Sequence, residues 1–463
     1  MRVLLIQPRQ KPGLGFKSIS VIEPLGLEMV AGNLEGHATV RILDLFSPAD
    51  LLPTLRQFKP DACGISCSFT VDVYQTLAIA RQIKAWRPET VVFTGGHHAS
   101  LTPEDLRDPA IDFIVTGEGE ETTPEALNCL ARGEDLRKIP GLVLNLDRGQ
   151  LATGARDLIK DLDGLPLPAR HLTTSYRKRY YLGFQRPISA LETARGCPFK
   201  CHFCSVWKFY RGRCRAKSPE RVVEEFRQIS SDYVLITDDN FLLDVGRAER
   251  IGVLLERAGI RKRINFQARS DTIIKHPSLI NLWHRLGLYK VFIGFEKVEE
   301  DELAAIGKRN TVENNERALK LLQERGIGVV ASFIVDPDYD RQDFAKLRNY
   351  VRRLKISTPS FTVLTPLPGT DLYNKLKEKI VYHNRELFDF LHAVLPTRLQ
   401  PQEFYRELAR LYLAAYGRPG YVVRSALSML AGLLTGRISL LQFRQLLIGG
   451  RRYINPWSYL VRG

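Results

Sequence analysis

The sequence predicts an α/β protein in three parts: a doubly wound, Rossmann-like domain, a partial barrel and a helical extension. Three observations predict this fold class. Short apolar runs rich in β-branched residues recur with helical segments between them, and parallel strands need such crossover helices. A stretch with prolines divides these runs into two groups. Towards the C-terminus the strand-like runs give way to helical periodicity.

Length and composition limit the possible classes. A chain of 463 residues suits two or three domains. Its apolar fraction of 44% and charged fraction of 25% are typical of a folded globular protein. The net charge of +16 favours an anionic partner such as nucleic acid, a membrane surface or a phosphorylated cofactor. Because no apolar run reaches the roughly 18 residues that span a bilayer and no signal-peptide layout occurs, we expect a cytoplasmic protein, with peripheral contact at the inner membrane face as a variant.

The first domain, residues 1–155, is expected to hold a parallel, doubly wound sheet. Five strand-like runs predict it, at residues 3–6, 40–43, 62–65, 91–93 and 113–115. Such sheets bind ligands at the carboxyl ends of their strands. Glycines, which let the backbone approach a ligand, and polar side chains lie there. The candidate contacts are Ser66, Ser68, Gly95, Gly96, His97, Gly117, Glu118 and Glu120.

The glycine-rich strand ends leave one alternative open, namely tight turns without a ligand. Nucleotide binding is disfavoured because no Gly-x-Gly-x-x-Gly follows the first strand and no Walker lysine pattern occurs. Cys63 and Cys67 share a Cys-x3-Cys spacing, but one lies within an apolar strand. We therefore expect both to be core or strand-end residues rather than metal ligands.

Residues 156–185 are expected to form a linker, because two prolines within 161–172 stop any regular element. The second domain, residues 186–380, is expected to be a partial (β/α)6 barrel of the TIM type. Ser218 and Pro219 predict one helix start, and Gly326 ends a helix that begins after Thr311. Six strand-like runs lie at residues 188–193, 233–237, 264–268, 291–295, 329–334 and 360–364.

Three cysteines follow the first barrel strand. Cys197, Cys201 and Cys204 have a Cys-x3-Cys-x2-Cys spacing, which lets one short loop offer three thiolates to a soft metal centre. A four-iron cluster held by three thiolates keeps one iron free for a ligand. The alternative is structural zinc with His202 or Cys214 as a fourth ligand. Disulfides are disfavoured because seven cysteines without a signal peptide indicate a reducing compartment.

The run Glu-Thr-Ala-Arg-Gly-Cys that ends at Cys197, with the loop behind it, resembles the signature of radical S-adenosylmethionine (SAM) enzymes. The resemblance implies a 4Fe-4S cluster whose free iron binds SAM, and it places Phe203 near the adenine. The runs Asp-Asp-Asn-Phe, Gln-Ala-Arg-Ser and Ile-Gly-Phe-Glu also match that family. The sequence departs from it before Pro337, where relatives usually carry a glycine. The SAM contacts implied by the resemblance are Asp238, Arg269 and Glu296.

The first domain resembles the cobalamin-binding domain that precedes the barrel in one branch of that family. The matching runs are Pro-Leu-Gly-Leu at residues 24–27, Thr-Gly-Gly-His-His at 94–98 and Val-Thr-Gly-Glu-Gly-Glu at 115–120. The Asp-x-His-x-x-Gly motif that supplies a histidine to cobalt is absent, and the His97-His98 pair does not replace it. The resemblance thus implies cobalamin whose lower face lacks a protein histidine.

The two resemblances together imply a cobalamin-dependent radical SAM methyltransferase that methylates an unactivated carbon of a hydrophobic substrate. They also imply an external electron donor such as flavodoxin or ferredoxin. Within the family, the Gly-Gly-His-His-Ala-Ser run, the length and the basic apolar tail are most similar to the hopanoid C-3 methylase branch. Methylases or cyclases of the bacteriochlorophyll pathway are the close alternative. An iron-sulfur or zinc protein that binds nucleic acid is the alternative from another class, supported by charge alone.

The extension, residues 381–463, is expected to be helical and basic. Helical spacing begins near Leu387, Leu391 and Leu395, and after Glu407 the sequence has eight arginines and no acidic residue. Residues 421–436 are strongly apolar, and Trp457 and Tyr459 follow, as in an interfacial amphipathic region. The alternative is a helical cap on the barrel. Nucleic acid is the less favoured partner because the aromatic residues form no stacking platform. A membrane contact favours a lipid-like substrate.

Overall fold

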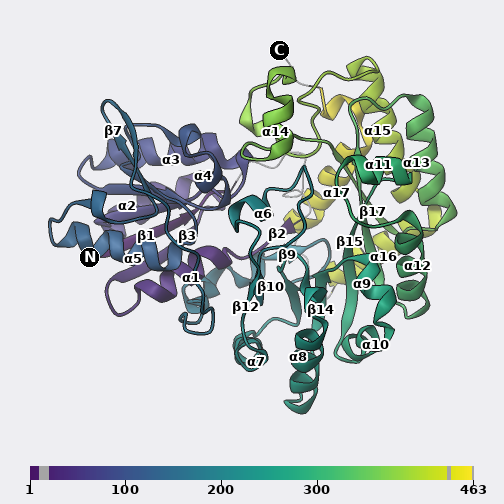
Figure 1. Cartoon of the computed structure of the whole chain (residues 1–463), viewed down its shortest axis with the longest axis horizontal. Helices are drawn as coiled ribbons and strands as arrows, with labels where there is room; N and C mark the ends of the chain where they lie inside the picture. The colour runs from purple at the N-terminus through teal and green to yellow at the C-terminus, as the bar shows by residue number, and fades with distance from the viewer. Residues whose placement is uncertain (10–19, 435–439, 461–463) are drawn as a thin grey trace.

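The computed structural model describes residues 1–9, 20–434 and 440–460. Two large sheets stand next to each other, one in the N-terminal domain and one in the barrel (Figure 1). The predicted α/β fold class is therefore confirmed. The predicted domain boundaries fall between these sheets and behind the second one, and they stay predictions.

The N-terminal sheet has seven strands in the order β3-β1-β4-β5-β6-β7-β8. All five expected strands form and pair in parallel, and helices cross over between them. The last two strands form an antiparallel hairpin that the periodicity did not indicate. The strands are β1 (Arg2–Gln7), β3 (Thr39–Asp44), β4 (Ala62–Ser66), β5 (Val91–Gly95), β6 (Phe113–Val115), β7 (Leu142–Leu146) and β8 (Gly149–Ala152). The helices are α1 (Leu25–Leu34), α2 (Leu51–Phe58), α3 (Val73–Trp86), α4 (His97–Leu101) and α5 (Gly119–Ala131).

The barrel sheet has six parallel strands in sequence order, β10-β13-β14-β15-β16-β17. Within the described residues β10 does not pair with β17, so the barrel is open, as a partial (β/α)6 barrel is expected to be. Its strands are β10 (Ile188–Leu191), β13 (Tyr233–Ile236), β14 (Arg263–Gln267), β15 (Leu288–Glu296), β16 (Gly328–Val335) and β17 (Thr358–Val363). Its helices are α7 (Pro219–Gln228), α8 (Val245–Arg257), α9 (Ser270–Lys275), α10 (Pro277–Arg285), α11 (Glu300–Ala305), α12 (Val312–Glu324), α13 (Arg341–Arg353) and α14 (Asp371–Leu376).

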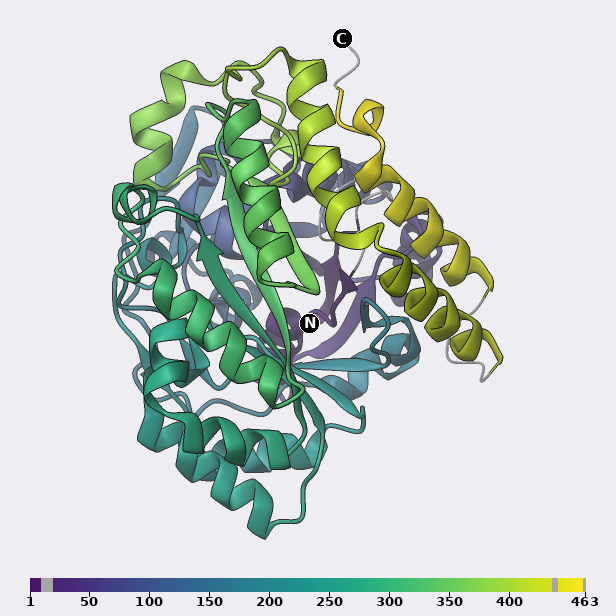
Figure 2. The ribbon, with the colours of Figure 1, turned by 90° about the vertical axis from the view of Figure 1, so that its right-hand side faces the viewer.

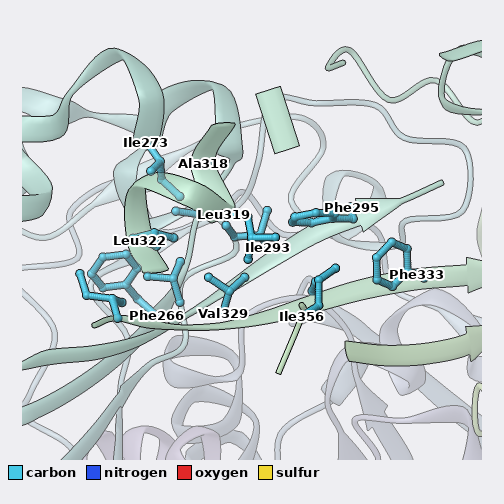
Figure 3. Packing of buried hydrophobic residues seen from close by; sticks show 14 of the residues in the cluster. Phe266, Ile273, Ile293, Phe295, Ala318, Leu319, Leu322, Val329, Phe333 and Ile356 are labelled. Carbon is cyan, nitrogen blue, oxygen red and sulfur yellow. The ribbon is translucent and has the colours of Figure 1, made fainter. Parts of the chain in front are cut away.

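The helix starts and the barrel core follow from local sequence. Ser218 accepts a hydrogen bond from the Arg221 backbone N–H at 3.1 Å and caps α7, and Thr311 caps α12 in the same way. Leu319 and Leu322 of α12 belong to one buried apolar cluster with side chains of β14, β15 and β16 (Figure 3). Burying this face holds the helical layer on the sheet.

A buried carboxylate joins the N-terminal domain, the linker and the barrel. Glu23 accepts a hydrogen bond from the Ala190 backbone N–H of β10 at 2.6 Å and forms ion pairs with Arg170 and Arg177. Arg170 donates to the Ala190 carbonyl oxygen at 2.6 Å. These two side chains therefore bond the backbone of the barrel's edge strand as a neighbouring strand would.

The linker has little regular structure, as its prolines predict. It contains a run of 3-10 turns, Arg170–Arg179, and β9 (Tyr181–Leu182), which pairs with β2 (Ser20–Val21). Thr173 of this run donates a hydrogen bond to Glu28 of α1. The linker is thus attached to the first domain through buried polar contacts.

The helix expected from Leu387 onward is wrong for residues 388–400, which form no regular element. Phe390 has a φ of +66°, and the Asp389 side chain accepts hydrogen bonds from the Leu391 and His392 backbone N–H groups. The Val363 backbone N–H donates to the Phe390 carbonyl oxygen at 2.7 Å. The apolar side chains of this segment are divided between two cores: Phe388, Val394 and Leu395 lie in a small cluster, and Leu391 and Ala393 lie in the barrel core.

Three helices end the chain, α15 (Pro401–Tyr416), α16 (Pro419–Leu434) and α17 (Leu440–Ile454). The first packs on the barrel, where the Tyr412 hydroxyl donates to the Phe361 carbonyl oxygen of β17 at 2.5 Å. The other two extend at the right of Figure 2, in dark yellow-green and yellow. Of the helices the structure describes, none has the length and apolar character needed to cross a membrane.

Candidate functional site

The cysteine loop lies between the two strands of a short antiparallel ribbon. After β10 the chain forms β11 (Ala194–Arg195), which pairs with β12 (Arg215–Ala216). Gly196 opens the loop with a φ of +89°, and a Cβ there would lie 2.1 Å from the Arg213 carbonyl oxygen. Only glycine fits this position, because a side chain would meet both a steric and a conformational penalty.

The three signature cysteines are free thiols, Cys201 buried and the other two half-buried. Burial raises the pKa of the Cys204 thiol to about 12 and raises the pKa values of Cys197 and Cys201. Within the described residues, no three His, Cys, Asp or Glu side chains form a group that could hold a single metal ion. Three free thiols on one loop are nevertheless the kind of donor set that iron-sulfur clusters take, and metal binding deprotonates such thiols. Cys214 is exposed near the end of the loop.

The carboxylates after β13 bind the start of this loop. Asp238 is buried and accepts hydrogen bonds from the Thr193 backbone N–H at 2.6 Å and from its hydroxyl. Burial raises the pKa of Asp238 to about 6 and that of Asp239 to about 7. Asp239 accepts from the Gly196 backbone N–H at 3.2 Å. The second barrel strand thereby fixes the entry to the cysteine loop.

Two other predicted SAM contacts lie at neighbouring strand ends. The Arg269 guanidinium stands 3.9 Å from the centre of the Phe199 ring, inside the cysteine loop, and pairs with Asp271 at 2.9 Å. Glu296 is buried at the end of β15, has a φ of +63° and pairs with Lys308 at 2.9 Å. The structure thus brings both strand ends to the barrel mouth.

Phe203 is half-buried in the cysteine loop itself. The loop also packs against the segment after α11, because the His202 backbone N–H donates to the Ile306 carbonyl oxygen at 3.3 Å. A Cβ on Gly307 would lie 3.2 Å from the His202 ring. His202 therefore contacts the barrel segment that follows α11.

The predicted ligand-binding strand ends of the first domain lie together at one sheet edge. The hydroxyls of Ser66 and Ser68 are 3.2 Å apart. Gly96 has a φ of +123°, and a Cβ there would lie 2.9 Å from the Cys67 carbonyl carbon and oxygen. Gly95 precedes it at the end of β5, and the Gly117 backbone N–H donates to the Ser100 hydroxyl. Cys63 and Cys67 are buried in the core, as expected.

His97 reaches from this edge to the cysteine loop. Its Nε2 atom lies 2.9 Å from the Ser205 hydroxyl, and its ring stacks on Phe209 of α6 (Val206–Phe209) with 4.6 Å between centroids. Burial and the neighbouring His98 lower the pKa of His97 to about 4, so the ring is neutral at pH 7. Figure 1 shows α6 between the two sheets. The predicted cofactor residue therefore forms part of the contact between the domains.

Glu118 and Glu120 bind a buried arginine of the barrel domain. The Arg195 side chain, 3% exposed, donates to Glu118 at 2.6 Å and to Glu120 at 2.5 Å. Arg195 also pairs with Glu192 at 2.7 Å, and Arg215 pairs with Glu118 at 2.7 Å. The residue two positions before Cys197 is thus held by two carboxylates of the other domain. The sequence analysis singled out Glu118 and Glu120 as candidate cofactor contacts, but it did not predict their pairing with Arg195.

The N-terminal domain and the barrel domain each match a known protein family. Residues 13–127 match the B12 binding domain, and residues 191–351 match the Radical SAM superfamily. Over 452 residues the chain is 34% identical to the hopanoid C-3 methylase of Methylococcus capsulatus, covering 96% of this chain and 86% of the relative. The chain belongs to the cobalamin-dependent radical SAM methyltransferases. Its cofactors are accordingly cobalamin, SAM and a 4Fe-4S cluster.

Another relative is named for a different reaction. The anaerobic magnesium-protoporphyrin IX monomethyl ester cyclase of Rubrivivax gelatinosus is 28% identical over 417 residues, covering 85% of this chain and 73% of the relative. Among solved structures, the radical SAM methyltransferase TsrM from Kitasatospora setae matches with a TM-score of 0.68 and 20% identity, covering 82% of this chain and 78% of that one. The cobalamin-dependent enzyme OxsB matches with a TM-score of 0.69 and 17% identity, covering 94% and 71%. These two likenesses establish the shared fold.

Proposed function

We propose that this methyltransferase methylates an unactivated carbon of a hydrophobic, lipid-like acceptor, and that this acceptor is a hopanoid. The observation that carries the proposal is the 34% identity to a hopanoid C-3 methylase along nearly the whole chain. When bound, the cluster and SAM supply the radical chemistry and cobalamin the methyl group. The protein's own part is to hold these groups together and keep water away from them.

Cys197, Cys201 and Cys204 hold the cluster in this proposal. Their support is the loop geometry: Gly196 sets the loop's entry, and Asp238 and Asp239 fix the backbone before the first cysteine. SAM contacts come from Phe203, Asp238, Arg269 and Glu296, which surround the same barrel mouth.

Cobalamin lies in the proposal at the sheet edge of the first domain, against Ser66, Ser68, Gly95, Gly96 and Gly117. The two glycines of β5 and its loop keep that edge free of side chains. His97 faces the cysteine loop from this edge, and its neutral ring is suited to a contact between two cofactor sites. Glu118 and Glu120 hold Arg195, so we assign them a positioning role beside the cofactor contact predicted for them.

The proposal also places the protein in the cytoplasm with peripheral contact at the inner membrane face. Exposed apolar side chains on α16 and the excess of arginines after Glu407 support it. A lipid-like acceptor would then be reached from the membrane surface. A flavodoxin or ferredoxin supplies the electron that SAM cleavage needs.

The cluster assignment is tested by anaerobic reconstitution with iron, sulfide and hydroxocobalamin. We expect absorption bands of an iron-sulfur cluster and of retained cobalamin, and 5'-deoxyadenosine formation from SAM and dithionite. Cys201→Ala should lose the cluster bands and the 5'-deoxyadenosine, while the matched control Cys214→Ala should keep both. Loss of 5'-deoxyadenosine in the control alone would contradict the assignment.

The acceptor is tested with lipid extracts and SAM that carries a deuterated methyl group. A hopanoid that gains the labelled methyl, identified by mass spectrometry, supports the proposal. A protoporphyrin monomethyl ester that is cyclised without gaining a label would instead place the enzyme with its cyclase relatives. Retention of the label in SAM with every acceptor would refute methyl transfer to a hydrophobic carbon.

A further inference from the structure

A second polar site lies outside the cysteine loop and the polar strand ends, between the barrel helix α13 and the C-terminal helices. A cavity of about 430 Å³ opens where α13, α15 and the start of α16 meet. Four arginines line it, Arg348 and Arg352 from α13, Arg410 from α15 and Arg418 from the connection to α16. The cavity is large enough to admit a phosphate group and part of a glycerol backbone.

The arginines of this cavity exceed their carboxylate partners. Glu407 pairs with Arg348 at 3.5 Å and also with Arg410, and it is buried. Arg352 is exposed and forms no ion pair with any described residue. Among the described residues, the four arginines thus have one carboxylate partner, which pairs with two of them. Such an excess of positive charge in a recess favours an anionic ligand.

One buried donor of the cavity lacks a partner. Arg418 donates through Nε to the Ala414 carbonyl oxygen at 3.2 Å, but its Nη2 is buried and makes no hydrogen bond. No carboxylate of a described residue offsets this donor, so the Arg418 guanidinium adds to the unmatched positive charge around the recess. Guanidinium groups bind phosphate oxygens in a forked geometry. Phosphate is therefore the ligand chemistry that the recess fits.

The surface next to the cavity is apolar. Leu413 lines the recess and is half exposed, and α16 begins directly beyond it. Leu427 is 61% exposed and Leu434 is 87% exposed along that helix, and Trp457 is 69% exposed after α17. Arginines beside exposed leucines and a tryptophan are typical of segments that lie in the headgroup region of a bilayer. The further exposed residues of α16 are Val422, Val423 and Leu430.

We propose that the Arg348, Arg352, Arg410 and Arg418 recess binds the phosphate of an anionic lipid headgroup while the exposed face of α16 enters the acyl boundary. This inference rests on the peripheral membrane contact proposed above and gives that contact a specific site. The ligand is a phosphodiester on a lipid surface. Free phosphate shares the chemistry, so the test separates the two sources.

The test uses the full chain and vesicles of phosphatidylcholine, alone or mixed with phosphatidylglycerol, in a co-sedimentation assay. Wild type is expected to bind the mixed vesicles. The Arg352→Gln/Arg410→Gln variant should bind them at least tenfold more weakly, since each arginine near an anionic surface contributes roughly a fivefold gain. The control Arg257→Gln/Arg261→Gln removes the same charge from exposed positions near the end of α8 and should bind as wild type does. Equal losses in both double variants would overturn the site.

Two further measurements separate the ligand sources. Inorganic phosphate, followed by calorimetry, should bind wild type and not the Arg352→Gln/Arg410→Gln variant. Leu427→Ser/Leu430→Ser should weaken vesicle binding but keep phosphate binding. Phosphate binding without vesicle binding would replace the lipid with a soluble phosphate and overturn the proposal. Vesicle binding that survives both double substitutions would overturn it as well. None of these assays contains SAM, so their failure leaves the methyl-transfer assays unaffected.

Discussion

Two groups of arginines differ in how completely they are paired. Arg195, between the two domains, is buried and meets carboxylates on Glu118, Glu120 and Glu192 within 2.7 Å. Of the four arginines of the C-terminal recess, Arg348 and Arg410 pair with Glu407, whereas Arg352 and Arg418 form no ion pair with a described residue. A buried arginine that is fully paired with carboxylates stabilises the packing of the two domains. Arginines that outnumber their carboxylate partners favour the binding of an anion. Net charge alone, +16 for the chain, does not separate these two roles.

Breaking the paired group should have the largest effect. Arg195→Met leaves buried carboxylates without their cation, and breaking such pairs costs about 3–5 kcal/mol of unfolding free energy. Chemical denaturation of the unreconstituted protein measures this loss. The control Arg250→Met breaks the exposed pair with Glu220 and should cost less than about 1 kcal/mol. Similar losses in the two variants would remove the distinction between the regions.

A titration at the linker contact gives the next largest effect. Burial and the neighbouring Glu23 raise the pKa of Glu28 from 4.5 to about 7. The folded state therefore keeps a proton that the unfolded chain releases, so this group's contribution to stability falls as pH rises from about 4.5 to about 7. Glu28→Gln should remove up to about 3 kcal/mol of that fall. Denaturation at pH 5 and pH 8 measures it, and an unchanged pH slope in the variant would contradict the protonated state.

A smaller effect is expected where the C-terminal helices meet the barrel. Tyr412→Phe removes the hydrogen bond to the Phe361 carbonyl oxygen, a loss of about 1 kcal/mol for a buried neutral bond. The apolar ring contact with Phe361 remains, so the helix should stay docked. Thermal unfolding measures the change. A loss as large as that of Arg195→Met would show that α15 depends on this bond far more than on its packing.

The smallest effect is expected in the unpaired group. Arg352→Gln removes an exposed side chain with no ion pair to a described residue, so the unfolding free energy should change by less than about 0.5 kcal/mol. A rise in the unfolding free energy of the variant would show that the four arginines repel one another in the native protein. A loss above about 2 kcal/mol would instead assign this arginine a structural role.

The sequence predicted the elements that depend on local pattern. Strand periodicity located the eleven parallel strands, and glycine and proline signals located the helix ends. The spacing of Cys197, Cys201 and Cys204 and the polar strand ends predicted the barrel-mouth site, whose ligand roles remain predictions. These features are readable because each is set by a few neighbouring residues.

Contacts between residues far apart in the sequence could not be predicted from local patterns. Arg195 and Glu120 lie 75 positions apart, and no local pattern links them. Residues 388–400 have helical apolar spacing, yet Phe390 adopts a positive φ, and Phe388 and Leu391 on either side of it are buried in two different cores. Tertiary burial overrode local propensity there. The arginine recess likewise depends on α13 and α15 meeting, which the sequence does not specify.

The contact between Glu23, Arg170 and the backbone of Ala190 has a consequence for the independence of the two domains. An open barrel has an exposed first strand, and exposed strands are templates on which other chains add and aggregate. Side chains of the first domain and of the linker, Glu23 and Arg170, cover this strand. A barrel domain that begins at residue 186 would lack these side chains and would expose the edge strand. The preceding part of the chain therefore also protects the barrel against self-association.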